Sequence, residues 1–214
     1  YLANGSEPWQ IPDVTTLPNI SVPFTTEPNA TDDDGNPVYW PYLRDEDTLA
    51  RPWAIPGTPG LQHRVGGLEK ADKTGNVNYT PENHALMGTL RQAKIDRIAD
   101  DYRPSVVGGD PEADLCLLSW GSTWAAVHAA VERKMRGGTK VAWIHLEHLN
   151  PLPNDLGGLL SRYDKVLVPE LNQGQLCQVV RGRYLVDAQP VSKVAGLPFT
   201  AREIETAIEE ALAS

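Results

Sequence analysis

Residues 166–180, VLVPELNQGQLCQVV, carry the clearest fold signal in the chain. The segment begins as an apolar strand, continues through Pro169-Glu170-Leu171-Asn172, and becomes helical within a few residues. In open α/β sheets, ligands and partner surfaces gather where strands end, because the following helix presents unpaired backbone N–H groups there. The junction is therefore either a candidate site or an ordinary connection in which Asn172 caps the helix and Gly174 allows a tight turn.

The same strand-to-helix step recurs from residue 113 to the end of the chain. The pattern predicts apolar strands at 113–121, 140–149, 165–171 and 186–194, and helices at 122–138, 154–163, 173–184 and 201–213. Near-continuous apolar strands of this kind are typical of a parallel sheet that is buried on both faces. Residues 105–214 are therefore predicted to form a three-layer α/β domain with a mostly parallel sheet. Its last helix begins with a capping box, Thr200-x-x-Glu203.

The first eighty residues have a different composition. Ten of the eighteen prolines lie within residues 1–60, so regular elements are not expected there. Aromatic side chains are scattered through the same segment, which a disordered linker would seldom contain; they are Trp9, Tyr39, Trp40, Tyr42 and Trp53. The composition predicts a Pro-rich, irregular but ordered arm. Residues 81–104 are predicted to form an amphipathic helix that links the arm to the α/β domain.

Composition also limits the possible partners. The chain has 28 acidic and 19 basic residues and a formal charge of −9, which argues against binding to nucleic acid. No apolar run is long enough to span a membrane. Cys116 and Cys177 are the only cysteines, which favours reduced thiols in a cytoplasmic protein and is too few for an iron–sulfur cluster. The chain begins Tyr1-Leu2-Ala3 without an initiator Met, so it is expected to be a piece of a longer polypeptide.

The motifs that suggest chemistry are incomplete. Trp120-Gly121-Ser122-Thr123 could hold an anion at a helix start or could simply cap the helix, and it lacks the glycine pattern of a dinucleotide site. In His145-Leu146-Glu147-His148, strand alternation places His148 opposite the other two polar residues, so no metal site is expected. Glu69, after Gly66-Gly67, could meet a partner's cofactor or lie in a surface turn.

Several segments together resemble a known family. YLANGSEPW, GGLEKADKTGNVNYTPENHALMGTLRQAKIDRIAD, LSWGSTWAAV, HLEHLNPLP, VLVPELNQGQL and YLVDAQPVSKVAGLPFTAREI are similar, in order, to the C-terminal part of the α subunit of 2-oxoacid:ferredoxin oxidoreductases. The similarity is greatest to the 2-oxoglutarate enzymes of actinobacteria. It covers nearly the whole chain.

The resemblance implies a role in central carbon metabolism within a larger assembly. Residues 1–80 would include the end of a thiamine-pyrimidine-binding domain followed by the arm, and residues 105–214 would be a transketolase C-terminal-like domain. The implied reaction converts 2-oxoglutarate and CoA to succinyl-CoA and CO2 and reduces ferredoxin. The full complex would contain thiamine diphosphate with Mg2+ and a [4Fe-4S] cluster. The β subunit would supply the diphosphate site and the cluster, and the α subunit the pyrimidine-binding domain. The isolated piece is not expected to be active.

The resemblance assigns no catalytic residue to this chain. It suggests that Asn4, Ser6, Glu7 and Glu69 lie near the catalytic interface. Many relatives have a histidine at the position of Lys70, so no histidine role is carried over to it.

The strand-end segment has a different expected role. Glu170, Asn172 and Gln173 are expected to recognise the backbone of a neighbouring domain or subunit. Replacement of Asn172 by Ala is then expected to weaken assembly before it affects any chemical step.

The sequence is also compatible with two other hypotheses. The chain could be a stand-alone α/β binding or scaffold domain that uses the same sheet end for an anion or a partner helix. It could also belong to another thiamine enzyme, which would share the domain but would not use ferredoxin.

Overall fold

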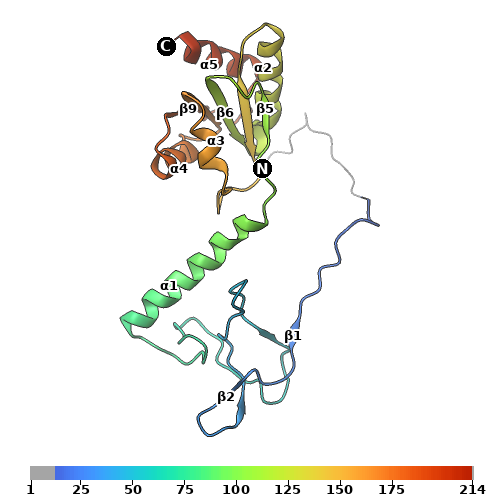
Figure 1. Cartoon of the computed structure of the whole chain (residues 1–214), viewed down its shortest axis with the longest axis vertical. Helices are drawn as coiled ribbons and strands as arrows, with labels where there is room; N and C mark the ends of the chain where they lie inside the picture. Colours follow the sequence, from blue (N-terminus) through green and yellow to red (C-terminus); the bar gives the residue numbers. More distant parts are fainter. Residues whose placement is uncertain (1–12, 214) are drawn as a thin grey trace. The chain divides into compact units, whose positions relative to one another are not determined.

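The computed structural model describes residues 13–213 of the chain. The described residues up to Asp101 form one compact unit, called here the first unit, and residues 102–213 form another, the second unit. Each unit has its own architecture. The second unit contains the sheet that the sequence predicts, and the first contains mainly irregular chain and one long helix (Figure 1).

The second unit is built on a five-stranded sheet with the order β5-β7-β6-β8-β9. The four strands β6 to β9 are mutually parallel, and β5 pairs with β7 in the antiparallel sense. The prediction of a mostly parallel α/β sheet is therefore confirmed. The strands are β5 (Val107–Gly109), β6 (Leu115–Trp120), β7 (Ala142–Leu146), β8 (Lys165–Glu170) and β9 (Ala188–Ser192).

Helices cover both faces of this sheet. α2 (Trp124–Arg136) and α5 (Ala201–Ala213) contribute buried side chains to one apolar core, and α3 (Leu156–Leu160) and α4 (Gln175–Tyr184) contribute to the other. The side chains along each strand alternate between the two cores, because successive strand side chains point to opposite faces of the sheet. In β6, Leu115 and Leu117 join the core beneath α2, whereas Cys116 and Leu118 join the core beneath α4. Alternation with burial on both sides explains the near-continuous apolar strands in the sequence.

Strand β5 was not predicted from the sequence. It is only three residues long, Val107-Gly108-Gly109, and glycines have low strand propensity. The tertiary structure explains the glycine: a Cβ atom at Gly108 would lie 2.1 Å from Cε2 of Trp143. The backbone of β5 therefore lies directly against the indole ring of β7.

The start of α5 has the predicted capping box. The Thr200 hydroxyl accepts a hydrogen bond from Glu203 N at 3.3 Å, and Glu203 Oε2 accepts from Thr200 N at 2.7 Å. Phe199 is buried in the same core as Ile204 of the first turn, as expected for a hydrophobic staple. The Lys193 ammonium and the Thr200 donors lower the pKa of the Glu203 carboxyl to about 2. This local network positions α5 on the sheet.

The first unit has no large sheet among its described residues. Its strands pair as β1 with β4 and β2 with β3, and each is two residues long; they are β1 (Phe24–Thr25), β2 (Ala30–Thr31), β3 (Pro37–Val38) and β4 (Trp53–Ala54). The long helix α1 (Pro81–Asp96) continues as a 3-10 turn, η1 (Arg97–Asp101). Thr80 caps α1 by accepting a hydrogen bond from Asn83 N, and Pro81 occupies the first helical position.

Polar contacts replace a large apolar core in the first unit. The Asn29 side chain pairs with the backbone of Trp40 through both its oxygen and its nitrogen. The guanidinium of Arg44, which is largely buried, bonds to Asp72 at 2.8 Å. These contacts fix irregular chain segments that have no ladder of backbone hydrogen bonds.

The capping box gives a stability prediction for the second unit. Thr200→Ala should lower its free energy of unfolding by about 1 kcal/mol, because Glu203 N loses its acceptor. The measurement is chemical denaturation at pH 7. Thr206→Ala is the matched control, since this exposed hydroxyl lies within the helix and bonds only to the Arg202 carbonyl. Equal losses for the two variants would contradict the capping role.

Candidate functional site

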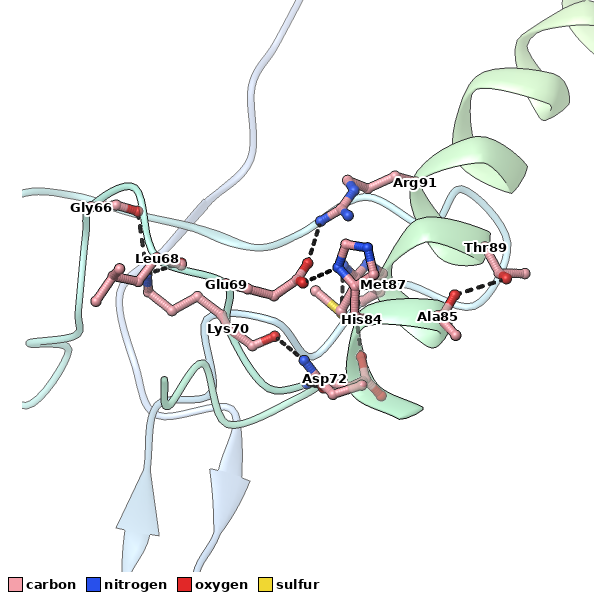
Figure 2. A network of polar contacts seen from close by, with 12 residues as sticks. Gly66, Leu68, Glu69, Lys70, Asp72, His84, Ala85, Met87, Thr89 and Arg91 are labelled. Carbon is pink, nitrogen blue, oxygen red and sulfur yellow. Dashed lines mark hydrogen bonds and ion pairs between the residues drawn. The ribbon is translucent and has the colours of Figure 1, made fainter. Parts of the chain in front are cut away.

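The segment 66–70 of the first unit is held by one buried lysine (Figure 2). Lys70 is 4% exposed, and its ammonium donates to the carbonyl oxygens of Gly66 and Leu68 at 3.2 and 2.5 Å. Its own carbonyl accepts from the Asn83 amide at 2.9 Å, which attaches the segment to α1. Lys70 therefore organises the backbone around Glu69.

Glu69 faces the first turns of α1. Its carboxylate contacts His84 Nδ1 through one oxygen and accepts from Arg91 Nη1 at 3.1 Å through the other. Figure 2 shows the two α1 side chains converging on Glu69. Hydrogen bonds from His84, which has the larger effect, and from Arg91 hold the pKa of the Glu69 carboxyl below its usual value. The side chain of His84 is 75% exposed and that of Arg91 57%, so the cluster lies at the surface of the first unit.

This arrangement has a definite chemical capacity. Glu69 is an ionised acceptor with both oxygens engaged, whereas His84 and Arg91 retain exposed nitrogens that a ligand or partner could approach. The cluster is therefore able to hold and orient polar groups. The sequence pattern singled out Glu69 but missed its partners. The available signal was the seven-residue spacing of His84 and Arg91, which places them on one face of a predicted helix.

The second candidate region is the carboxyl end of β8. Glu170, the last residue of the strand, is fully buried. Its carboxylate accepts four hydrogen bonds, from Trp120 Nε1, Asn172 Nδ2, Leu176 N and Cys177 N, at 2.9 to 3.3 Å. Two of these donors are backbone amides in the first turn of α4, where a negative group is favoured by the helix dipole. Glu170 therefore serves the chain internally as the acceptor for the donors at the start of α4.

Asn172 completes the same turn. Its side-chain oxygen accepts from Gly174 N at 2.8 Å and from Gln175 N at 2.9 Å, while its nitrogen donates to Glu170. Asn172 thus closes the turn that precedes α4, and the N-cap residue of that helix is Gly174, so the interpretation of Asn172 as the N-cap is wrong. The next residue, Gln173, is exposed, and Leu171 is 37% exposed. These two side chains are the part of the junction available to a neighbour.

The topology explains why Trp120 reaches Glu170. β7, which follows β6 in the chain, pairs with one edge of β6. β8, which follows β7, pairs with the other edge of β6. Crossover helices on opposite faces make the ends of β6 and β8 the switch point of the sheet, where α/β proteins commonly bind ligands. Here the switch point is closed by the indole of Trp120 against the Glu170 carboxylate. The hydroxyl of Thr123 bonds to the backbone of Trp120, so this segment caps its own turn.

The predicted site residues thus fall into separate groups. Glu69 lies in the first unit, and Glu170, Asn172 and Gln173 lie together in the second. Asn4, Ser6 and Glu7 lie outside the described residues. Within residues 13–213 there is no cluster of three or more His, Cys, Asp or Glu side chains that could hold a metal ion. No helix in that range combines the length and the hydropathy that crossing a bilayer would require.

The lowered pKa of Glu69 predicts a pH-dependent contribution to stability. A carboxyl whose folded pKa is below its unfolded value of about 4.5 stabilises the fold above that value, and the stabilisation is lost as pH falls through the folded pKa. Glu69→Gln should therefore lower the melting temperature of the first unit at pH 7 and have a progressively smaller effect below pH 4.5.

The matched control is Glu27→Gln, an exposed carboxyl in the same unit. Thermal unfolding is followed for both variants and the parent chain across the acid range. A destabilisation by Glu69→Gln that stays constant down to the most acid pH would show that the charge is not the cause.

Comparison with known proteins identifies similar chains. The 2-oxoglutarate oxidoreductase subunit KorA of Mycobacterium tuberculosis is 53% identical over 214 residues, which is 99% of this chain. Subunit alpha of 2-oxoacid:ferredoxin oxidoreductase 1 from Aeropyrum pernix is 30% identical over 147 residues, 65% of this chain. The solved 2-oxoglutarate:ferredoxin oxidoreductase from Magnetococcus marinus superposes with a TM-score of 0.74 at 36% identity and covers 85% of this chain.

These proteins are considerably longer than the present chain. The chain spans 31% of the mycobacterial subunit, 22% of the Aeropyrum subunit and 32% of the solved Magnetococcus chain. No protein-family model matches it. The resemblance expected from the PELNQGQL and GLPFT segments is confirmed by the near-complete coverage at 53% identity. The chain corresponds to part of an α subunit of the 2-oxoacid:ferredoxin oxidoreductase family.

Proposed function

We propose that this chain is a structural and assembly module of a 2-oxoglutarate:ferredoxin oxidoreductase. The observation that carries the proposal is the 53% identity over 99% of the chain to a 2-oxoglutarate oxidoreductase subunit. The fold supports it, since the solved relative with the TM-score of 0.74 is an enzyme with 2-oxoglutarate, coenzyme A and succinyl-CoA bound. The assembled enzyme would convert 2-oxoglutarate and CoA to succinyl-CoA and CO2 and pass the electrons to ferredoxin in the cytoplasm.

The proposal divides the polypeptide into parts with different tasks. Residues 1–80 would comprise the end of a pyrimidine-binding domain and a Pro-rich arm, residues 81–104 the linking helix, and residues 105–214 a transketolase C-terminal-like domain. The remainder of the α subunit would precede this chain as its N-terminal part. A β subunit would complete the active site, and ferredoxin would be the electron acceptor.

Thiamine diphosphate with Mg2+ and a [4Fe-4S] cluster are proposed for the other parts of the assembly. The described residues of this chain do not fit the iron–sulfur cluster. The only two cysteines, Cys116 and Cys177, are buried on one face of the sheet, and a [4Fe-4S] cluster requires about four thiolates. Burial raises the pKa of the Cys116 thiol to about 12, which opposes the thiolate form that binds metal.

The Glu69 cluster is proposed to face the catalytic interface, together with Asn4, Ser6 and Glu7. Its support is electrostatic and geometric. Glu69 is kept ionised by His84 and Arg91, and Lys70 fixes the backbone that presents it. A charged cluster with exposed imidazole and guanidinium groups is suited to position a neighbouring subunit or an anionic substrate group.

The β8–α4 junction is proposed to contact a neighbouring domain or subunit. Glu170 and Asn172 would act by fixing the shape of the turn, since their polar atoms already bond within the chain. Leu171 and Gln173 would make the direct contacts. Asn172→Ala would then weaken assembly because the turn loses its hydrogen bonds. Gln173→Ala would weaken assembly by removing a direct contact while the turn stays intact.

The function is tested by expressing the full-length α subunit that contains this chain and isolating its native complex. Intact mass and native mass should show a larger α chain with a β-like partner. The complex should have brown iron–sulfur absorbance and should form succinyl-CoA with reduction of ferredoxin only when 2-oxoglutarate and CoA are both present. Thiamine diphosphate without iron would instead indicate another thiamine enzyme, and a lone chain without cofactors would favour a binding module.

The assembly role gives a separate prediction. Gln173→Ala and Leu171→Asp should increase the dissociation of the complex on dilution, while turnover of the complex that remains assembled is unchanged. Native mass spectrometry over a dilution series measures the first quantity, and specific activity of the assembled fraction measures the second. Val179→Asp is the control, because this side chain of α4 is also exposed, at 52%. Unchanged assembly with slowed turnover would contradict an assembly role.

A further inference from the structure

The first unit contains an open cavity of about 510 Å³ that the proposed function does not use. This volume is in the range of sites that bind small organic ligands and exceeds what a simple ion needs. Three chain segments, distant in sequence, form its walls. The lining residues are Val38, Tyr39, Trp40, Gln62, His63, Arg64, Thr74, Gly75 and Asn76.

The cavity walls are held by contacts outside the cavity. The Tyr39 hydroxyl donates to the Pro52 carbonyl at 3.0 Å, and Trp40 is fixed by both polar atoms of the Asn29 side chain. Gly75 closes the turn between Ala71 and Asn76 with a φ of 71°, and a Cβ atom there would lie 2.5 Å from Pro41 Cγ. The turn therefore requires glycine in order to lie against the neighbouring wall. A cavity with walls fixed in this way is preformed.

The charge of the lining favours an anion. None of the nine lining residues is acidic, although the chain as a whole carries a formal charge of −9. The guanidinium of Arg64 is exposed and makes no hydrogen bond or ion pair with any residue of the described part of the chain. In the same range, the side-chain amides of Gln62 and Asn76 make none either. Uncommitted donors of this kind can bind carboxylate or phosphate oxygens, and a guanidinium can do so through two parallel bonds.

The aromatic part of the lining favours a planar group. The His63 ring lies 5.2 Å from the Tyr39 ring in an edge-on arrangement, and Trp40 lines the same cavity. His63 Nδ1 lies 2.8 Å from the Leu61 carbonyl oxygen, which requires Nδ1 to be the donor. In the neutral ring Nε2 is then an acceptor, suited to an N–H or amino group of a heterocycle. Aromatic walls and one acceptor beside a guanidinium are the features that a nucleotide would use.

We propose that the cavity between segments 38–40, 62–64 and 74–76 binds a nucleoside phosphate, with its phosphate on Arg64 and Asn76 and its base against Trp40 and His63. The site requires no metal and no chemical step. It lies entirely within the first unit, and its occupancy does not depend on turnover by the assembled enzyme. A failure of the proposed oxidoreductase activity would therefore leave this proposal standing, and the converse also holds.

The test is equilibrium binding of ADP to the full-length protein in its native complex by isothermal titration calorimetry. Adenosine and inorganic phosphate serve as the two partial ligands, and each should bind more weakly than ADP. Arg64→Ala should weaken ADP binding by about tenfold or more, as expected for loss of a charge-assisted hydrogen bond. Asn76→Ala should weaken it by a smaller factor.

Arg103→Ala is the matched control, since it removes the same charge from an exposed position in the second unit and should leave ADP affinity unchanged. Thermal unfolding of each variant verifies that it is folded. ADP affinity that is unaffected by both Arg64→Ala and Asn76→Ala would overturn the assignment. Inorganic phosphate that binds as tightly as ADP would also overturn it, because the base would then contribute nothing.

Discussion

The pairing of β6 with β7 on one side and β8 on the other is the constraint on which the second unit depends. β6 is enclosed by parallel neighbours at both edges and by helices on both faces. Leu115, Cys116, Leu117 and Leu118 are each at most 1% exposed. Every backbone polar group of such a strand must find a partner in the adjacent strands, since water cannot reach it. The order and direction of the surrounding strands are fixed as a result.

Burial on all sides also determines how polar groups near the strand ends behave. Glu170 lies at the end of β8, where solvent is excluded, and an unpaired carboxylate would be very costly there. The amides of α4, the Asn172 side chain and the Trp120 indole together satisfy it. Among the described residues, no buried side-chain nitrogen or oxygen lacks a partner. The junction was a candidate binding site in the sequence, but most of its polar groups bond within the chain and connect β8 to α4.

The first unit follows a different strategy. Its described residues include few fully buried apolar side chains, among them Leu61 and Met87, and short strands instead of a sheet. Lys70 and Asn83 hold neighbouring segments together through hydrogen bonds to backbone groups, in place of apolar packing. This arrangement leaves Glu69 and His84 near the surface, where they pair with each other.

The sequence by itself determined the local features: the strand and helix periods from residue 113 onward and the Thr200–Glu203 capping box. These depend on side-chain spacing within one segment, so the physical causes are present in the sequence. It also singled out Glu69 after the double glycine Gly66-Gly67, and its resemblance to the oxidoreductase α subunits identified the family. Only the tertiary structure decided that β5 pairs against Trp143, that Trp120 closes the switch point over Glu170, and that His84 and Arg91 converge on Glu69. Such contacts join residues 15 to 50 positions apart, and their existence depends on chain topology and close packing, which no local pattern encodes.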